Sequence, residues 1–204
     1  MNKVNERNRS KKLRRKIIVN FNEGDLWVTL TYAKDKRPAD EKESKKEINK
    51  FMRKLRYRFQ KMKKAFKWIL STEYMASAIH HHLIVNNPEG MNVMKIINEC
   101  WTKGHPSFKA LYEDGNYAAL ADYVVKEAKG RVKKTAYTCS RNLQEPKVTR
   151  TVVSANSWAK EPKAQKGYVV DKTSICMGIS DITGYPYQYY SMYRIDKDRG
   201  KSDT

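Results

Sequence analysis

The chain of 204 residues has few cysteines and no long apolar run. Cys100, Cys139 and Cys176 are odd in number and far apart, which fits neither a disulfide framework nor a CxxC zinc site and favours a reducing cytoplasm. The absence of a run of about 18 apolar residues excludes a transmembrane helix. Residues 1–16 do not lead into the apolar core of a signal peptide. No GxxxxGK(S/T) phosphate-binding sequence is present, so we expect the chain to lack a helicase of its own.

Acidic residues are also scarce, because 22 Asp and Glu stand against 42 Lys and Arg and leave a formal charge of +20 at pH 7. Apolar residues still make up 40% of the chain, which is too much for a disordered basic tail and indicates a folded protein. A folded protein with this charge is expected to bind a polyanion, usually nucleic acid, with membrane surfaces as the weaker alternative. The excess charge lies in residues 1–16, 41–67 and 126–166, whereas residues 68–125 hold 3 basic and 6 acidic residues.

Apolar periodicity predicts a β-sheet with helices laid against it. Residues 43–66 carry an apolar stripe at three- and four-residue steps, typical of a long helix whose other face is mostly Lys and Arg. Shorter helices are expected over 93–101 and 116–130. β-branched and aromatic runs predict a hairpin over 17–32, a hairpin with strands 68–74 and 79–85 joined by a four-residue loop, and strands over 135–140, 167–170 and 175–179.

Three of the four histidines are consecutive, in the strand expected over 79–85. Side chains alternate along a strand, so His80 and His82 share one face and His81 points the other way. If the four-residue loop closes a simple hairpin, Glu73 lies opposite His80 on that same face. Two imidazoles and a carboxylate would form a metal site with coordination positions open to a substrate. The alternative is a histidine run on a wet strand surface, and a one-residue slip in register would break the site.

Tyr123 and Lys126 lie three residues apart in the helix expected over 116–130, so they are neighbours on one helix face. A tyrosine phenol becomes a useful nucleophile when a metal or another cation stabilises its charge and orients the target. Tyr117 is a second candidate for the nucleophile. The alternative for Tyr123 is an amphipathic side chain at the edge of the core.

Two further segments accompany these residues: Leu30-Thr31-Tyr32 at the end of the first long strand, and Tyr137 with Ser140-Arg141-Asn142-Leu143. With Glu73, the run from His80 to Val85 and the segment Tyr123-Val124-Val125-Lys126, they resemble the HUH endonuclease superfamily. The resemblance covers roughly residues 27–143 and is to the rolling-circle replication initiator (Rep) proteins of plasmids, phages and integrative elements. One departure is His81, which stands where the family has a hydrophobe. The resemblance implies an α+β fold with a central antiparallel sheet flanked by helices, related to the ferredoxin and RNA-recognition-motif plan.

The resemblance also implies an activity, a metal-dependent endonuclease that nicks and rejoins single-stranded DNA at an origin. His80, His82 and Glu73 would hold Mg²⁺ or Mn²⁺, Tyr123 would attack the scissile phosphorus to give a 5′-phosphotyrosine, and Lys126 would neutralise or orient the phosphate. The expected partners are single-stranded DNA or an origin hairpin, a host helicase and a DNA polymerase, in the cytoplasm of a bacterial host and without a membrane. The alternatives are an HUH transposase or mobilisation relaxase and, in another class, a non-catalytic single-stranded nucleic-acid-binding protein.

The expected domain organisation has three parts: a basic N-terminal arm (1–16), an endonuclease domain (17–145) and a C-terminal extension (146–204) packed on the same domain. The candidate DNA-binding cations come from the basic segments and are Arg53, Lys54, Arg56, Arg58 and Arg141. The tyrosines of residues 185–193 could stack unpaired bases, but packing in a strand is the role we expect for them.

Overall fold

The computed structural model describes residues 3–74, 79–111, 117–126, 136–152 and 161–194. Contacts divide the chain into two compact units, unit one with residues 1–147 and unit two with residues 148–204. None of the helices within the described ranges combines the length and the apolar character that crossing a membrane requires.

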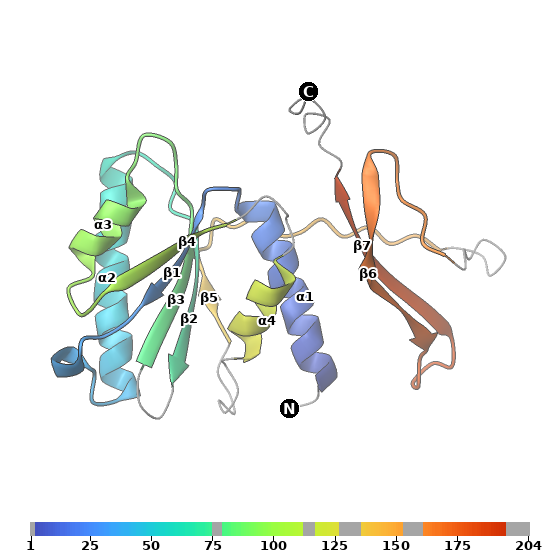
Figure 1. Ribbon diagram of the computed structural model, residues 1–204, viewed down its shortest axis with the longest axis horizontal. Helices are drawn as coiled ribbons and strands as arrows, with labels where there is room; N and C mark the ends of the chain where they lie inside the picture. Colours follow the sequence, from blue (N-terminus) through green and yellow to red (C-terminus); the bar gives the residue numbers. More distant parts are fainter. Residues whose placement is uncertain (1–2, 75–78, 112–116, 127–135, 153–160, 195–204) are drawn as a thin grey trace, which may run out of the picture. The chain divides into compact units, whose positions relative to one another are not determined.

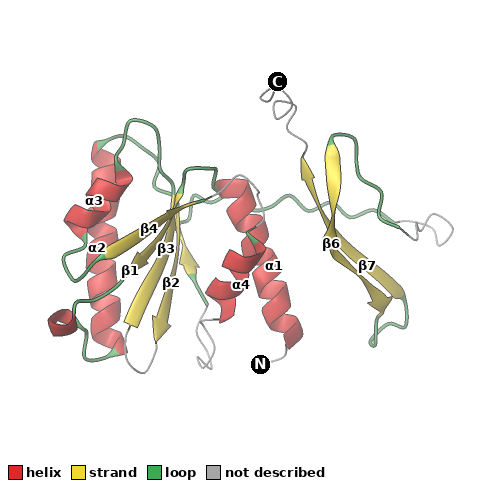
Figure 2. Ribbon diagram, in the orientation of Figure 1, coloured by secondary structure: helices red, strands yellow, loops and turns green. Residues whose placement is uncertain are grey.

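Unit one is built on a five-stranded sheet with the strand order β4-β1-β3-β2-β5, in which every pairing is antiparallel. The strands are β1 (Leu26–Leu30), β2 (Trp68–Tyr74), β3 (Ile79–Val85), β4 (Pro106–Ala110) and β5 (Thr138–Cys139). Helices α2 (Glu41–Lys61) and α3 (Val93–Cys100) cover one face, and α1 (Lys3–Asn20) and α4 (Ala118–Lys126) cover the other (Figures 1 and 2). A short 3₁₀ turn, Lys34–Lys36, precedes α2. The predicted fold class, α+β with a central antiparallel sheet flanked by helices, is confirmed.

Helix α2 begins where Asp40 caps it, because the Asp40 side chain accepts a hydrogen bond from the Glu43 backbone N–H at 2.7 Å. Its buried stripe follows the predicted helical spacing and packs against strands β1 and β3. Full burial of each large apolar side chain stabilises the fold by about 1.5–3 kcal/mol. The stripe consists of Ile48, Phe51, Met52, Leu55 and Phe59.

Helix α1 corrects two predictions. Residues 17–21 were expected to form a strand paired with β1, but the helix continues through Asn20. Leu13 and Ile17, one turn apart, are fully buried and pack with α4 residues such as Val124. The described residues of the expected arm, 3–16, therefore belong to a helix that packs on the sheet domain rather than to an arm outside it.

The second hairpin has the predicted strands and register. β2 and β3 pair so that Tyr74 lies opposite Ile79 and Glu73 lies opposite His80. The predicted joining loop, residues 75–78, is outside the described residues. The strand predicted over 135–140 is reduced to β5, with residue 135 outside the described ranges.

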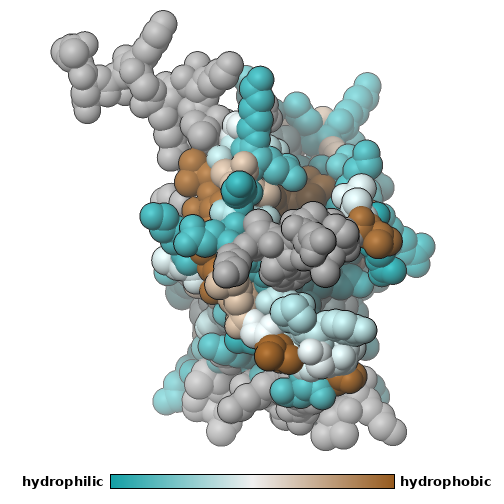
Figure 3. Space-filling model, turned by 90° about the vertical axis from the view of Figure 1, so that its right-hand side faces the viewer, coloured by the Kyte–Doolittle hydropathy of each residue, from teal (hydrophilic) through white to brown (hydrophobic). Residues whose placement is uncertain are grey.

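Unit two is an antiparallel pair of strands, β6 (Tyr168–Ile179) and β7 (Pro186–Arg194). The runs predicted as two strands over 167–170 and 175–179 form one long strand, with an irregularity between Asp171 and Cys176. Gly178 pairs with Tyr187, and a Cβ at Gly178 would lie 3.0 Å from the Tyr187 hydroxyl. Met177 and Ile179 are exposed, and hydrophobic side chains lie among hydrophilic ones on the face shown in Figure 3.

Candidate active site

The hairpin register brings the chemically active side chains of β2 and β3 to one face of the sheet. Ser71 pairs with His82 and Glu73 pairs with His80, and paired residues of an antiparallel ladder project to the same side. Ile69 and Ile84, on this same face, pack with α1 and α4. The predicted carboxylate and imidazoles therefore lie on the face that α4 covers.

Glu73, His82 and Tyr123 meet at a single point. The Tyr123 hydroxyl donates to Glu73 Oε2 at 3.0 Å and lies 3.2 Å from His82 Nε2. His82 Nε2 and Glu73 Oε2 are 3.1 Å apart. Glu73 and His82 are buried, at 7% and 5% exposure, whereas Tyr123 is 37% exposed. The phenol thus joins a buried pair of polar groups to solvent.

The orientation of His82 is fixed by strand β1. The indole of Trp27 stacks on the imidazole with an interplanar angle of 4° and a centroid distance of 5.1 Å. Thr29 Oγ1 lies 3.2 Å from His82 Nδ1, which directs Nε2 toward Glu73 and Tyr123. Burial lowers the pKa of His82 below its usual value of 6.5, and the nearby Glu73 carboxylate acts in the opposite direction. A neutral imidazole is the form that can bind a metal.

His81 points to the opposite face, as its position in the strand predicts. It is fully buried, and its Nε2 lies 2.8 Å from the Tyr32 hydroxyl while its Nδ1 lies 2.9 Å from Thr72 Oγ1. The ring of Trp101 contacts it edge-on. A histidine can replace a hydrophobe here because hydroxyl groups from β2 and from the end of β1 satisfy both ring nitrogens.

His80 lies on the same face as Glu73 and is partly exposed. It is close enough to His82 for its charge to lower the pKa of that residue. Within the described ranges, no three His, Cys, Asp or Glu side chains converge closely enough to hold a metal ion. The tight cluster therefore contains two of the three predicted ligands, Glu73 and His82.

Helix α4 carries the tyrosines and the lysine of the predicted site. Tyr117, just before the helix, is 8% exposed and packs in the core between α1 and the sheet. Tyr123 is the tyrosine that reaches Glu73 and His82. Lys126 is exposed at the last residue of α4. The predicted ends of this helix, at Asn116 and Gly130, lie outside the described residues.

A cleft of about 420 Å³ opens beside the cluster, between the sheet and α4. It is lined by Trp27, Thr29, His82, Ser107, Lys109, Leu120 and Tyr123.

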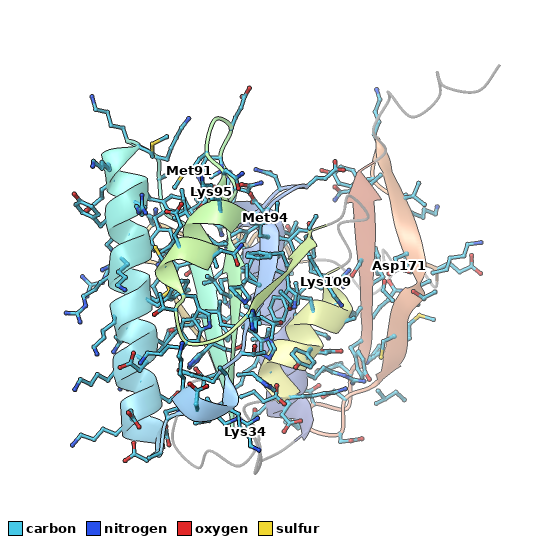
Figure 4. All side chains as sticks on the ribbon, turned by 60° about the vertical axis from the view of Figure 1, so that its left-hand side comes forward. Lys34, Met91, Met94, Lys95, Lys109 and Asp171 are labelled. Atoms are coloured by element: carbon cyan, nitrogen blue, oxygen red, sulfur yellow. The ribbon has the colours of Figure 1, made fainter. Side chains whose placement is uncertain are left out.

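Strand register explains why four strand residues meet in this cleft. Trp27 pairs with Lys109, and Thr29 pairs with Ser107 on one side and with His82 on the other. Figure 4 shows Lys109 beside α4. Sequence reasoning missed Ser107 and Lys109 because β4 has no strong local signal, whereas the shared parity of Trp27 and Thr29 could have placed both on the site face.

The predicted DNA-binding cations of α2 have different surroundings. Arg58 forms an ion pair with Glu99 of α3 at 2.5 Å. Arg53 and Arg56 line a separate groove. Lys54 is exposed on the same helix, and Arg141 is exposed after β5.

Fold and cluster together define a class: an α+β protein whose antiparallel sheet presents a carboxylate, an imidazole and a phenol to a cleft that also contains a lysine. Residues 25–128, just over half of the chain, match the family of replication-associated proteins of the ORF2 type. The chain therefore belongs to this replication-associated protein family, which supports a Rep-type replication initiator. Comparisons with curated proteins and with solved structures give no significant match.

Proposed function

We propose that this protein is a rolling-circle replication initiator that nicks and rejoins single-stranded DNA through Tyr123. The contact of the Tyr123 hydroxyl with Glu73 and His82, at 3.0 and 3.2 Å, carries the proposal. A partly exposed phenol held by a buried carboxylate and a buried imidazole is unusual for a packing residue, and it borders a cleft. The family match covers all three residues.

The donor set fits a divalent cation. Glu73 Oε2, His82 Nε2 and the Tyr123 oxygen lie within 3.2 Å of one another, so lone pairs of three atoms converge on a small volume. Carboxylate and imidazole suit Mg²⁺ and Mn²⁺ in different degrees, and the mixed set favours Mn²⁺ more than a set of oxygens alone. Glu73 and His82 would hold the ion, with His80 of the same strand face as a third ligand. When bound, the ion would polarise a non-bridging oxygen of the scissile phosphate.

Tyr123 supplies the nucleophile. Its oxygen forms a bond to phosphorus as the bond from phosphorus to the 3′ oxygen breaks, which leaves a 5′-phosphotyrosine and a free 3′-OH. The phenol proton passes to the Glu73 carboxylate, to which it is already hydrogen-bonded, and the departing 3′ oxygen takes up a proton from solvent. The phosphodiester energy remains in the tyrosyl ester, so a later 3′-OH can reverse the step and rejoin the strand.

Cationic and hydroxyl groups of the cleft orient the phosphate. Lys109 and the Ser107 hydroxyl line the cleft with Tyr123, and Lys126 lies one turn further along α4. A lysine binds phosphate as a point charge, so Lys109 would lower the negative potential near the attacking oxygen. A 3′-OH released at an origin would be extended by a host polymerase, with strand separation by a host helicase.

The test is formation of a covalent adduct. The protein is incubated with Mn²⁺ and a random pool of single-stranded oligonucleotides labelled at the 3′ end, because the 5′-phosphotyrosine keeps the 3′ fragment. Label should stay on the protein through a denaturing gel and disappear with chelator or in Tyr123→Phe. Tyr117→Phe is the matched control and should keep the adduct if it folds. Tight binding of the pool without any adduct would instead support a non-catalytic single-strand-binding protein.

A further inference from the structure

A second groove, of about 910 Å³, runs along α2 on the side of strands β2 and β5. Its polar wall comes from α2 and the residue that caps it, and its floor comes from Met52, Trp68 and Leu70, with Thr138 of β5 at the sheet edge. The basic residues in its lining are Lys42, Lys45, Lys46, Arg53 and Arg56. Figure 4 shows long side chains projecting from α2.

These cations lie along one stripe of the helix. Positions 42, 46, 49, 53 and 56 advance by three or four residues, so they follow one face of α2. From Lys42 to Arg56 the helix rises by about 21 Å, the length of about six stacked nucleotides at 3.4 Å each. The stripe could thus follow a run of phosphates.

The cations of the groove differ from other basic residues of α2 in having no carboxylate partner. Among the described residues, no ion pair involves any of the five. By contrast, Lys50 pairs with Glu47 at 3.0 Å, and Arg58 pairs with Glu99. Unpaired cations repel one another in the free protein, and a bound polyanion would remove that repulsion.

The two acidic residues of the lining are occupied by helix capping. Asp40 accepts from the Glu43 backbone N–H, and Glu43 in turn accepts from the Ala39 backbone N–H, each at 2.7 Å. This reciprocal pair lies at the N-terminus of α2, so the part of the groove near Arg53 and Arg56 is free of acidic residues in the described lining.

The groove lies on the face of the sheet opposite the candidate active site. Side chains alternate along β2, so Trp68 and Leu70 project toward α2, whereas Glu73 projects toward α4. Leu70 belongs to the core under α2, and Ile69 belongs to the core under α4. A strand that occupied both places would have to pass around the edge of the sheet at β2 and β5.

We propose that this groove is a second binding site for single-stranded DNA, which holds a segment of the strand away from the scissile phosphate. The cationic stripe contacts backbone phosphates, and the partly buried Trp68 on the apolar floor stacks against an unpaired base. A cationic wall beside an aromatic floor suits a single strand, because the bases of a duplex are stacked on each other and cannot reach the floor. The proposal rests on single-stranded DNA being the substrate of the Tyr123 site.

The experiment compares two double variants of the full-length protein with equal loss of charge. Arg53→Gln/Arg56→Gln removes two cations of the groove, and Lys50→Gln/Lys61→Gln removes two cations of the same helix outside its lining. Fluorescence anisotropy with a 30-nucleotide single-stranded oligonucleotide gives the dissociation constant at several salt concentrations. The groove variant should bind at least tenfold more weakly, and its salt slope should fall by about 1.4, which is about 0.7 for each lost phosphate contact. The control variant should change binding less than threefold.

Equal weakening in both variants would overturn the proposal, because it would mean that only net charge matters. A loss with a duplex of the same length that equals the loss with the single strand would also overturn it. As a second measurement, an oligonucleotide with 5-iododeoxyuridine at successive positions should crosslink to Trp68, and crosslinks confined to Trp27 would contradict the proposal. Binding does not require cleavage, so an absent covalent adduct would refute nicking by Tyr123 and leave this result interpretable.

Discussion

Replacing His81 with alanine should destabilise unit one strongly, whereas replacing the adjacent His80 should not. His81 is fully buried and bridges the Tyr32 hydroxyl and the Thr72 hydroxyl at 2.8 and 2.9 Å. His80 is partly exposed on the other face of the same strand. Neighbouring positions of identical chemistry therefore provide a matched pair.

The magnitude follows from the groups that lose a partner. A buried polar group that loses its hydrogen bond costs about 1–3 kcal/mol, and His81→Ala removes the imidazole from two hydroxyl groups. The missing ring also leaves a cavity, which costs about 24 cal/mol per Å³. We expect about 4 kcal/mol in total for His81→Ala and less than about 1 kcal/mol for His80→Ala.

The assay is urea-induced unfolding followed by circular dichroism. Tyr32→Phe serves as a partial perturbation, because it keeps the ring and removes one hydrogen bond to His81. The double variant should cost less than the sum of the two single variants, since both remove the same interaction. A cost below about 1 kcal/mol for His81→Ala, or full additivity with Tyr32→Phe, would refute the reasoning.

Three further predictions concern other parts of unit one. The Glu145 carboxylate bonded to the Lys16 ammonium, at 2.5 Å, raises the pKa of Lys16 above its usual 10.5. This stabilisation is complete below pH 10.5 and is lost as the pH rises through the folded-state pKa, so urea midpoints measured above and below pH 10.5 should fall more in the wild type than in Glu145→Gln. Lys109→Gln should weaken binding of a short oligonucleotide severalfold and lower the salt slope by about 0.7, and an unchanged slope would remove Lys109 from the phosphate site. Gly104→Ala would bring its Cβ to 2.2 Å from the Thr31 carbonyl oxygen, so its melting temperature should fall clearly, and an unchanged value would show that the backbone yields.

The hairpin of β2 and β3 could be predicted because its information is local. A four-residue loop and alternating side chains fix one register, which places Glu73 opposite His80 and turns His81 away. The apolar stripe of α2 was equally readable, since each buried residue follows the last by one helical turn. Strand β4 and the position of Lys109 depend on pairing with β1, about 80 residues earlier in the chain, and local patterns carry no such information.

The strand predicted over 17–21 failed for a different reason. Ile17, Ile18 and Val19 have high strand propensity, but they continue a segment rich in Lys, Arg and Leu that favours a helix. Helical spacing lets Ile17 follow Leu13 into the core, and the burial of these two side chains outweighs the small propensity difference. The convergence of Tyr123 with Glu73 could be proposed from sequence through a resemblance, but the contact itself depends on how α4 packs on the sheet.

The docking of α1 also sets a time in the life of the nascent chain. Asn20 and Gln144 exchange two hydrogen bonds, at 2.7 and 2.9 Å, although 124 residues separate them. At a synthesis rate of about 5–20 residues per second, roughly 6–25 s pass between the emergence of α1 and that of its last partners. During this interval the apolar side chains of Leu13 and Ile17 lack the surface that later covers them. The first helix made by the ribosome is therefore among the last to be fixed in place, and it is where a chaperone would be expected to act.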